Sequence, residues 1–336
     1  MITMNPVHYS TTDPAFWTGR IDDPTDRDSF RMHQIITLIN LSTISTIQLN
    51  SNSINICFIG FRCDEGVKRN LGRPGAERGP EYIRKEFANL PVTFTESIQL
   101  YDAGDIYCVD GNMEVAQDDL ARAVTIILNN AMFPIVLGGG HELSLGNYTG
   151  IMDFLKTTTP ESSLGIINFD AHFDLRPYKE HGSSGTMFSQ IADQCKNNNK
   201  PFNYMCLGIQ TYGNTISLFK RADALGVKYI LSKDITDTTL DTISRDIALF
   251  TEQHSHLYVT LCSDVFSSAF APGVSALQPF GMHPEVFLRF FKEIVKTEKV
   301  ISFDVAEVSP RFDQDNHTAK LIAIILYALI NTMKES

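Results

Sequence analysis

The chain has 336 residues, of which 43% are hydrophobic and 20% charged, and its formal net charge is −11. This balance is typical of a globular protein and excludes a disordered chain, a collagen-like fibre and a long coiled coil. The acidic charge argues against a general binder of nucleic acid or anionic membranes, although a local cluster of arginines can still bind a small anion. We therefore expect neither nucleic acid nor a membrane as a partner.

The six cysteines are scattered without a CxxC pair, and the N-terminal segment lacks a basic region followed by an apolar run. These features predict reduced thiols in a cytoplasmic protein without a signal peptide. The longest apolar run, near 321–330, is far shorter than the roughly 20 residues that cross a bilayer. We therefore expect a soluble chain.

Residues 1–50 are polar and then mixed, which predicts an N-terminal extension packed on the body of the protein. After this extension, short apolar runs alternate with segments of helical character. The apolar runs, expected as strands, are 54–60, 98–102, 133–137, 164–170, 203–207, 228–231, 257–261 and 300–303. The segments expected as helices are 81–89, 113–130, 144–156, 215–225, 239–254, 284–297 and 318–334.

The alternation of apolar runs and helices predicts parallel βαβ units whose strands are buried on both faces. Strands in this number fit one large doubly wound sheet better than two small domains, so we expect a single α/β domain over 1–336. Ligands of such sheets bind beyond the carboxyl ends of the strands. Reactive residues should therefore follow the apolar runs.

Polar clusters do follow three of these runs. Asp170, His172 and Asp174 alternate with apolar residues, so an extended segment places them on one face. Carboxylate and imidazole ligands suit a borderline-hard divalent ion such as Mn²⁺. A polar strand end with a capping aspartate is the alternative for this triplet alone. His141, after three glycines, and Asp264 also stand at strand ends, and the five residues together predict a metal site.

Three motifs resemble the ureohydrolase (arginase) family, which includes arginase, agmatinase and formimidoylglutamase. They are GGGH ending at His141, DAHFD over 170–174, and the segment from Asp264 to 273. The resemblance covers nearly the whole chain. It implies a three-layer α/β/α fold with a sheet of about eight mainly parallel strands. It also implies two Mn²⁺ ions that share a bridging hydroxide.

The resemblance also assigns ligands by motif position. One ion would be bound by His141, Asp170, Asp174 and the residue at 262, and the other by Asp170, His172, Asp264 and again the residue at 262. Most of the family has Asp at this last position, whereas this chain has Cys262. A thiolate is softer than a carboxylate and prefers Zn²⁺ or Fe²⁺ to Mn²⁺.

A Cys-x-Asp variant occurs within formimidoylglutamases, so Cys262 does not imply an inactive protein. The identity of the metal and the filling of the second position stay open, and a small packed residue beside the site is the alternative for Cys262.

Other segments favour formimidoylglutamase within the family. Residues 69–76 resemble its Arg-Asn-x-Gly-Arg-x-Gly-Ala segment, and residues 183–188 resemble its Ser-Ser-Gly-Thr-x-Phe. Agmatinases carry His where Ser184 stands in this chain. The resemblance implies metal-dependent hydrolysis of the C–N amidine bond of N-formimidoyl-L-glutamate to L-glutamate and formamide, a step of histidine degradation. The alternatives are another ureohydrolase, such as agmatinase or guanidino-acid hydrolase, and a non-catalytic metal-binding family member.

Such an anionic amidine substrate needs both cations and a carboxylate in its site. Arg69, Arg73 and Arg176 are expected to bind substrate carboxylates bidentately, with a structural ion pair as the alternative for each. Ser184 is expected to contact the substrate as well. Glu307 stands where family members have a glutamate that hydrogen-bonds the cationic amidine, and an acid that caps the helix expected over 318–334 is the alternative.

The remaining catalytic role is proton transfer. Asp170 or the residue at 262 is expected to carry the proton to the leaving amine. Family members are often trimers or hexamers, so the resemblance leaves open whether this chain forms a homo-oligomer.

Overall fold

The computed structural model describes residues 4–50 and 52–335. Its ten strands form one sheet in the order β1-β4-β3-β5-β10-β9-β6-β7-β8, and β2 pairs with β4. All pairs are parallel except β1 with β4. The long strands are β3 (Ile54–Arg62), β4 (Ile98–Tyr107), β5 (Phe133–Gly138), β6 (Leu164–Phe169), β7 (Tyr204–Ile209), β8 (Lys228–Leu231), β9 (His256–Cys262) and β10 (Val300–Ala306).

These eight strands are the eight apolar runs of the sequence, and the prediction of a mainly parallel α/β sheet is confirmed. Two short strands of the N-terminal segment enlarge the sheet at one edge, β1 (Tyr9–Ser10) and β2 (Thr37–Leu38). Both pair with β4, so these parts of residues 4–50 lie against the body of the protein.

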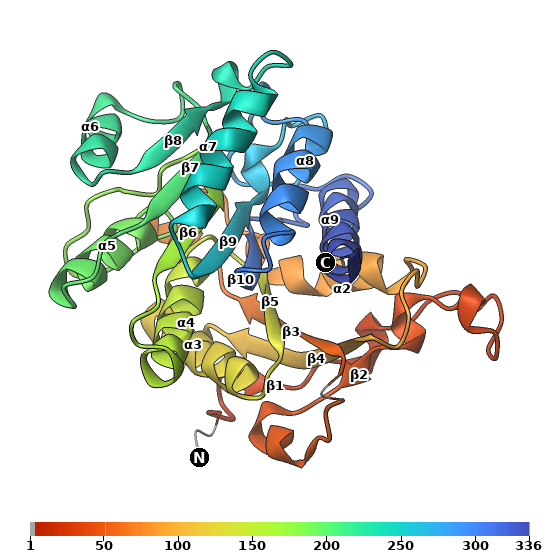
Figure 1. Cartoon of the computed structure of the whole chain (residues 1–336). Helices are drawn as coiled ribbons and strands as arrows, with labels where there is room; N and C mark the ends of the chain where they lie inside the picture. Colours follow the sequence, from red (N-terminus) through yellow and green to blue (C-terminus); the bar gives the residue numbers. More distant parts are fainter. Residues whose placement is uncertain (1–3, 51, 336) are drawn as a thin grey trace.

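Helices cover both faces of the sheet (Figure 1). One face carries α2, α7, α8 and α9, and the other carries α3, α4 and α5. None of the helices among the described residues is long and apolar enough to cross a bilayer. The helices are α1 (Glu65–Arg69), α2 (Gly79–Ala88), α3 (Met113–Asn129), α4 (Leu143–Thr158), α5 (Met187–Asn197), α6 (Ile216–Ala224), α7 (Leu240–Glu252), α8 (Pro284–Val295) and α9 (His317–Glu335).

Two hydrophobic cores hold the three layers together, one on each side of the sheet. The alternation of side chains along each strand supplies both cores, because successive residues point to opposite faces. In β3, for example, Ile56 and Phe58 belong to one core, whereas Cys57 and Ile59 belong to the other. This double burial explains why the strands read as continuous apolar runs.

The strand predicted over 98–102 continues to Tyr107, and a buried ion-pair cluster explains the difference. The segment following Leu100 contains Asp102 and Asp105, which resemble a strand end. Arg84 of α2 reaches both: its Nε lies 2.7 Å from Asp102 Oδ2, and its Nη1 lies 2.6 Å from Asp105 Oδ1. The N-terminal segment joins this cluster, since Trp17 Nε1 donates to Asp102 Oδ2 at 2.6 Å.

Helices α1 and α5 were not predicted from the sequence. Helix α1 has only five residues. Helix α5 is short and mixes polar with apolar residues, and it buries Met187, Phe188, Ile191 and Cys195 against the neighbouring core. Its apolar spacing fits a helix, but the run of glycine and serine before it reads as a loop.

Candidate metal centre and active site

The predicted site residues gather at the carboxyl ends of four adjacent strands. β5, β10, β9 and β6 are consecutive in the sheet. His141 follows β5, Glu307 follows β10, Cys262 ends β9 and Asp170 follows β6. Because all four strands are parallel, these ends lie at one edge of the sheet, as the sequence predicted.

Side-chain ligand atoms form two groups at this edge, and Asp170 belongs to both. The first group is His141, Asp170 and Cys262, and within it the ligand atoms lie within 4.8 Å of one another. The second is Asp170, His172 and Asp264, with the same spacing. Cys262 belongs to the first group only, whereas the resemblance assigned the residue at 262 to both ions.

Individual distances show how tightly the donors converge. Nδ1 of His141 lies 3.0 Å from Oδ2 of Asp170 and 3.0 Å from Oδ2 of Asp174. Nδ1 of His172 lies 3.2 Å from Oδ2 of Asp264 and 3.5 Å from Oδ1 of Asp170. All five N- and O-donor residues predicted for the metal site therefore point to one region.

The donor set fits divalent cations. Three aspartates and a cysteine surround two imidazoles, and most of these side chains are buried. Within the described part of the chain, Oδ1 of Asp264 is buried without a hydrogen-bond partner. A buried carboxylate oxygen without a partner is costly, and a bound cation would offset that cost. Carboxylate and imidazole donors with one thiol are ligands of Mn²⁺, Zn²⁺ and Fe²⁺.

The electrostatics of the groups lead to the same conclusion. Burial raises the pKa of Asp174 to about 6, and the charge of Asp170 adds to this effect. For His141, burial lowers the pKa, but the hydrogen bonds and charges of Asp170 and Asp174 outweigh it, so the pKa is raised well above its ordinary value. Burial also raises the pKa of the Cys262 thiol well above its ordinary range. Without cations, His141 and Cys262 therefore keep their protons near neutral pH, and a metal that binds them would displace those protons.

Thr260 is a residue of the site that sequence reasoning missed. Its Oγ1 lies 3.0 Å from Nε2 of His141, on the opposite side of the ring from the carboxylates, and 3.2 Å from Oγ of Ser144. Such a partner holds the ring of a metal ligand in place. Thr260 precedes Cys262 by two residues on β9, so strand alternation could have placed it on the same face.

Glu307 is held above the first group by the backbone. Its Oε1 accepts a hydrogen bond from the N–H of His141 at 3.1 Å, and its own N–H donates to the carbonyl of Gly139 at 2.8 Å. Its φ of 66° is in the left-handed region, as is the φ of 49° at Asp174. Strained backbone of this kind occurs preferentially at functional sites.

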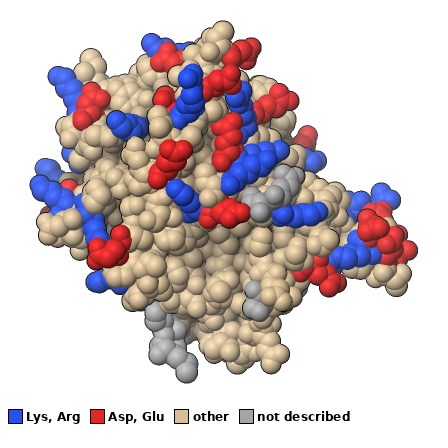
Figure 2. All heavy atoms as spheres, in the orientation of Figure 1, with Lys and Arg blue, Asp and Glu red and all other residues tan. Residues whose placement is uncertain are grey.

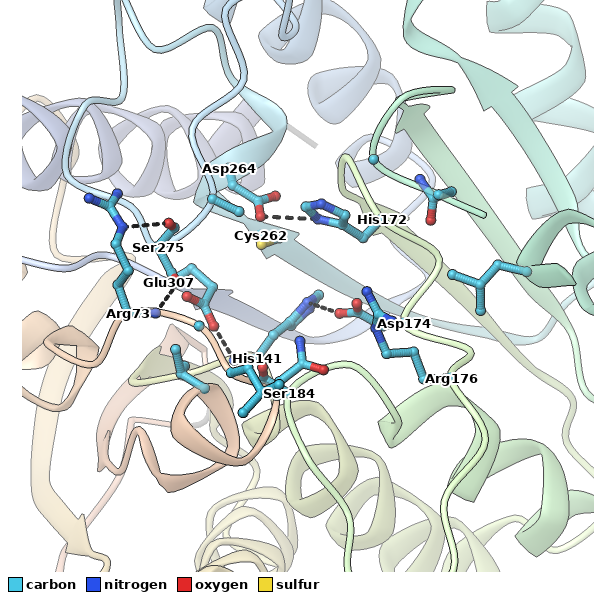
Figure 3. A pocket seen from close by; sticks show the side chains of 18 residues that line it. Arg73, His141, His172, Asp174, Arg176, Ser184, Cys262, Asp264, Ser275 and Glu307 are labelled. Atoms are coloured by element: carbon cyan, nitrogen blue, oxygen red, sulfur yellow. Dashed lines mark hydrogen bonds and ion pairs between the residues drawn. The ribbon is translucent and has the colours of Figure 1, made fainter. Parts of the chain in front are cut away.

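A cavity of about 320 Å³ opens above these groups (Figure 3). His141, His172, Asp174, Cys262, Asp264 and Glu307 line it, whereas Asp170 lies beneath them. The walls also include Asn70, Leu71, Arg73, Arg176, Ser184, Asn214, Leu218, Ser275 and Ala276.

The three predicted arginines lie in different surroundings. Arg176 lines the cavity, and its guanidinium has no ion pair within the residues that the structure describes. Arg73 also lines the cavity, but its guanidinium donates to the carbonyls of Val274 and Ser275.

Arg69 lies outside this cavity, where its guanidinium pairs with Glu114 at 2.6 Å and with Glu65 at 3.3 Å. Of the three, Arg176 is the cation whose hydrogen-bonding capacity is left for a ligand. Ser184 is a buried part of the cavity wall, and its N–H donates to the carbonyl of Gly66 at 3.1 Å.

Comparisons with known proteins give the family. The model described as "Arginase family" matches residues 54–331. The formimidoylglutamase of Clostridium tetani is 48% identical over 328 residues, which are 97% of this chain and 97% of that protein. The formimidoylglutamase of Geobacillus thermodenitrificans is 42% identical over 94% of each chain.

Solved structures share the fold. A formimidoylglutamase from Bacillus subtilis aligns with a TM-score of 0.76 at 22% identity, over 93% of this chain and 94% of that one. A formiminoglutamase from Trypanosoma cruzi with Mn²⁺ aligns with a TM-score of 0.74 at 23% identity, over 88% and 98%. The matched length, the identity to sequence relatives and the shared fold agree: the chain belongs to the arginase family.

Proposed function

We propose that the protein hydrolyses the C–N bond of the formimidoyl group of N-formimidoyl-L-glutamate and releases L-glutamate and formamide. The observation that carries this proposal is the position of Arg176, an unpaired guanidinium in the wall of the same cavity as both ligand groups, within the described residues. The relatives at 48% and 42% identity, named formimidoylglutamase, support the same substrate. An anionic amidine suits a cavity with a cation on its wall and carboxylates on its floor.

His141, Asp170, Asp174 and Cys262 would hold one divalent cation, and Asp170, His172 and Asp264 would hold a second. Mn²⁺ suits the carboxylate and imidazole donors, whereas Cys262 favours Zn²⁺ or Fe²⁺ in the first group. When bound, such cations lower the pKa of water, so that hydroxide is available near neutral pH.

Glu307 orients the amidine. The formimidoyl group is a planar cation with N–H donors, and a carboxylate accepts from them through charge-assisted hydrogen bonds. Oε1 already accepts from the N–H of His141, which fixes the direction of the carboxylate. Glu307 would thereby hold and orient the amidine over the ligand groups.

Arg176 and Ser184 bind the glutamate part of the substrate. The guanidinium can bind a carboxylate bidentately, and the backbone of Arg176 is fixed because its N–H donates to the carbonyl of Gly185 at 2.9 Å. Arg73 adds positive charge to the opposite wall, although two carbonyls occupy its guanidinium.

Asp170 is better placed to bind cations than to transfer a proton. Its Oδ1 accepts from the N–H of His172 at 2.8 Å, its Oδ2 lies close to His141, and the side chain is fully buried. Asp264 lines the cavity that the substrate would enter, whereas Asp170 does not. We therefore assign the proton that reaches the leaving amine to Asp264 rather than to Asp170.

A small molecule is the partner that the surface supports. Figure 2 shows acidic and basic side chains intermingled over the face drawn, without the broad basic field that nucleic acid requires. The six cysteines are free thiols, which agrees with a cytoplasmic location. A homo-oligomer stays a prediction from the family.

Turnover of three substrates in parallel tests the proposal. The protein is loaded separately with Mn²⁺, Zn²⁺ and Fe²⁺, and formamide release from formimidoylglutamate is compared with urea release from arginine and agmatine. We expect metal-dependent formamide release and little urea. Glu307→Gln should abolish turnover while leaving the metal content unchanged. Faster turnover of agmatine or arginine, or no release of formamide with any metal, would overturn the assignment.

A further inference from the structure

Leu71 combines three unfavourable or unusual features at the mouth of the cavity. Its φ is 61°, in the left-handed region that leucine rarely adopts. Its side chain is 94% exposed. It also lines the cavity, as do its neighbours Asn70, Gly72 and Arg73. Neither the metal groups nor the proposed carboxylate contact uses it.

Two residues of the proposed active site have the same kind of strained backbone as Leu71. Among the residues that the structure describes, nine apart from glycine have a positive φ, and three of these line the cavity: Leu71, Asp174 and Glu307. The other two belong to the chemistry already described. Strained residues cluster where the surrounding structure holds a side chain in a functional position.

The backbone around Leu71 is fixed rather than loose. Helix α1 ends in a Schellman motif, in which the N–H of Leu71 donates to the carbonyl of Lys68 at 3.0 Å and the N–H of Gly72 to that of Val67 at 2.8 Å. Two residues later, the N–H of Arg73 donates to Oγ of Ser275 at 2.8 Å. The leucine side chain is therefore presented at a set place on the rim.

We propose that Leu71 is a specificity-determining residue that packs on the two methylene groups between the carboxylates of the substrate; this inference rests on the proposed function. The amidine occupies the floor beside Glu307, so the aliphatic part of the molecule must cross the mouth. Leu218 and Ala276 line the same cavity and extend the apolar surface. Binding then buries a leucine that the free protein leaves in water, which favours the complex.

The test compares two variants, in each of which glycine replaces a residue with a left-handed backbone conformation. Leu71→Gly removes the side chain, and glycine is the residue preferred at this position of a Schellman motif. Ala131→Gly is the matched control, because Ala131 is exposed, has a φ of 55° and ends α3 in the same motif. Both variants should keep or raise the thermal midpoint. Leu71→Gly should raise KM for formimidoylglutamate about fivefold, equivalent to about 1 kcal/mol, with kcat within twofold.

A second substrate distinguishes the loss of a contact between Leu71 and the substrate from a general effect of the substitution on the structure. N-formimidoylglycine lacks the two methylene groups, so Leu71→Gly should leave its kcat/KM within twofold, and Ala131→Gly should change neither substrate. An unchanged KM for formimidoylglutamate in Leu71→Gly would overturn the inference while the proposed function stands.

Two other outcomes also overturn it. A change in sedimentation with Leu71→Gly at unchanged KM would assign Leu71 to a contact between copies of the chain. Absence of wild-type turnover of formimidoylglutamate would overturn the proposed function and the inference with it. If Leu71→Gly folds poorly, Leu71→Asn, which also tolerates the left-handed region, takes its place with the same expected results.

Discussion

Nδ1 of His141 lies 3.0 Å from Oδ2 of Asp170, although the two residues follow different strands and are separated by a whole helix. This contact joins the ends of β5 and β6, and the sulfur of Cys262 on β9 lies within 4.8 Å of donor atoms of both residues. The first ligand group therefore combines a nitrogen, an oxygen and a sulfur donor. Its composition decides which metal it prefers.

Cys262→Asp should shift the metal preference towards Mn²⁺. A hard carboxylate replaces a soft thiol in the first ligand group, so affinity for Mn²⁺ should rise relative to Zn²⁺. The measurement is metal content by mass spectrometry after dialysis against equal Mn²⁺ and Zn²⁺. Cys262→Ser is the comparison variant. An aspartate at Cys206 would not serve as a control, because Cys206 is buried in the core. An unchanged Mn²⁺ to Zn²⁺ ratio would mean that Cys262 only packs beside the site.

Arg176→Ala should raise KM for formimidoylglutamate at least tenfold, about 1.4 kcal/mol. The reason is the loss of a charge-assisted contact, which contributes about 1.5–3 kcal/mol. Arg176→Lys keeps the charge but not the fork geometry and should give an intermediate KM. Steady-state kinetics checks both variants. If Arg69→Ala or Arg73→Ala raised KM and Arg176→Ala did not, the carboxylate would bind at the loop after β3.

Arg84→Ala should destabilise the protein by about 3–5 kcal/mol, because two buried carboxylates lose their counter-charge. The side chains of Arg84 and Asp102 are both fully buried. Arg289→Ala is the matched control, since Arg289 also pairs with an aspartate at 2.6 Å, but at the surface. Its loss should change the free energy of unfolding far less than the loss of Arg84, because solvent screens an exposed ion pair. Urea unfolding at pH 7.5 measures both, and similar losses would contradict the prediction.

Stability should fall below neutral pH partly through His254. Burial lowers the pKa of His254 from 6.5, and Lys299 adds to the effect. Both ring nitrogens are buried without a hydrogen-bond partner among the described residues. The folded protein therefore binds fewer protons here than the unfolded chain, so the free energy of unfolding decreases as pH falls through 6.5 towards the folded pKa.

Urea unfolding at pH 5, 6 and 7.5 tests the role of His254. The parent should lose more stability than His254→Gln over this range, by about 1.4 kcal/mol for each unit by which the pKa is lowered. Burial lowers the pKa of His256 as well, but that contribution is present in both proteins and cancels in the difference. Parallel pH profiles would show that His254 does not contribute.

The sequence alone was sufficient for the features that depend on local order. Apolar runs alternating with helices specified the parallel sheet, because strands covered on both faces must be apolar throughout. The spacing of Asp170, His172 and Asp174 specified a shared face, and their place after a strand specified the edge of the sheet. These properties depend on the periodicity of apolar residues and on chain direction, and both can be determined from the sequence.

Only the tertiary structure decided which charged residues are available to a ligand. Arg69 and Arg176 look equivalent in the sequence, but Glu114 neutralises Arg69, whereas Arg176 lines the cavity without an ion pair in the described part of the chain. Asp102 resembles a strand end in the sequence, whereas in the structure it lies inside β4, where Arg84 offsets its charge. Ion pairs join residues far apart in the chain, and their partners follow from packing rather than from local sequence.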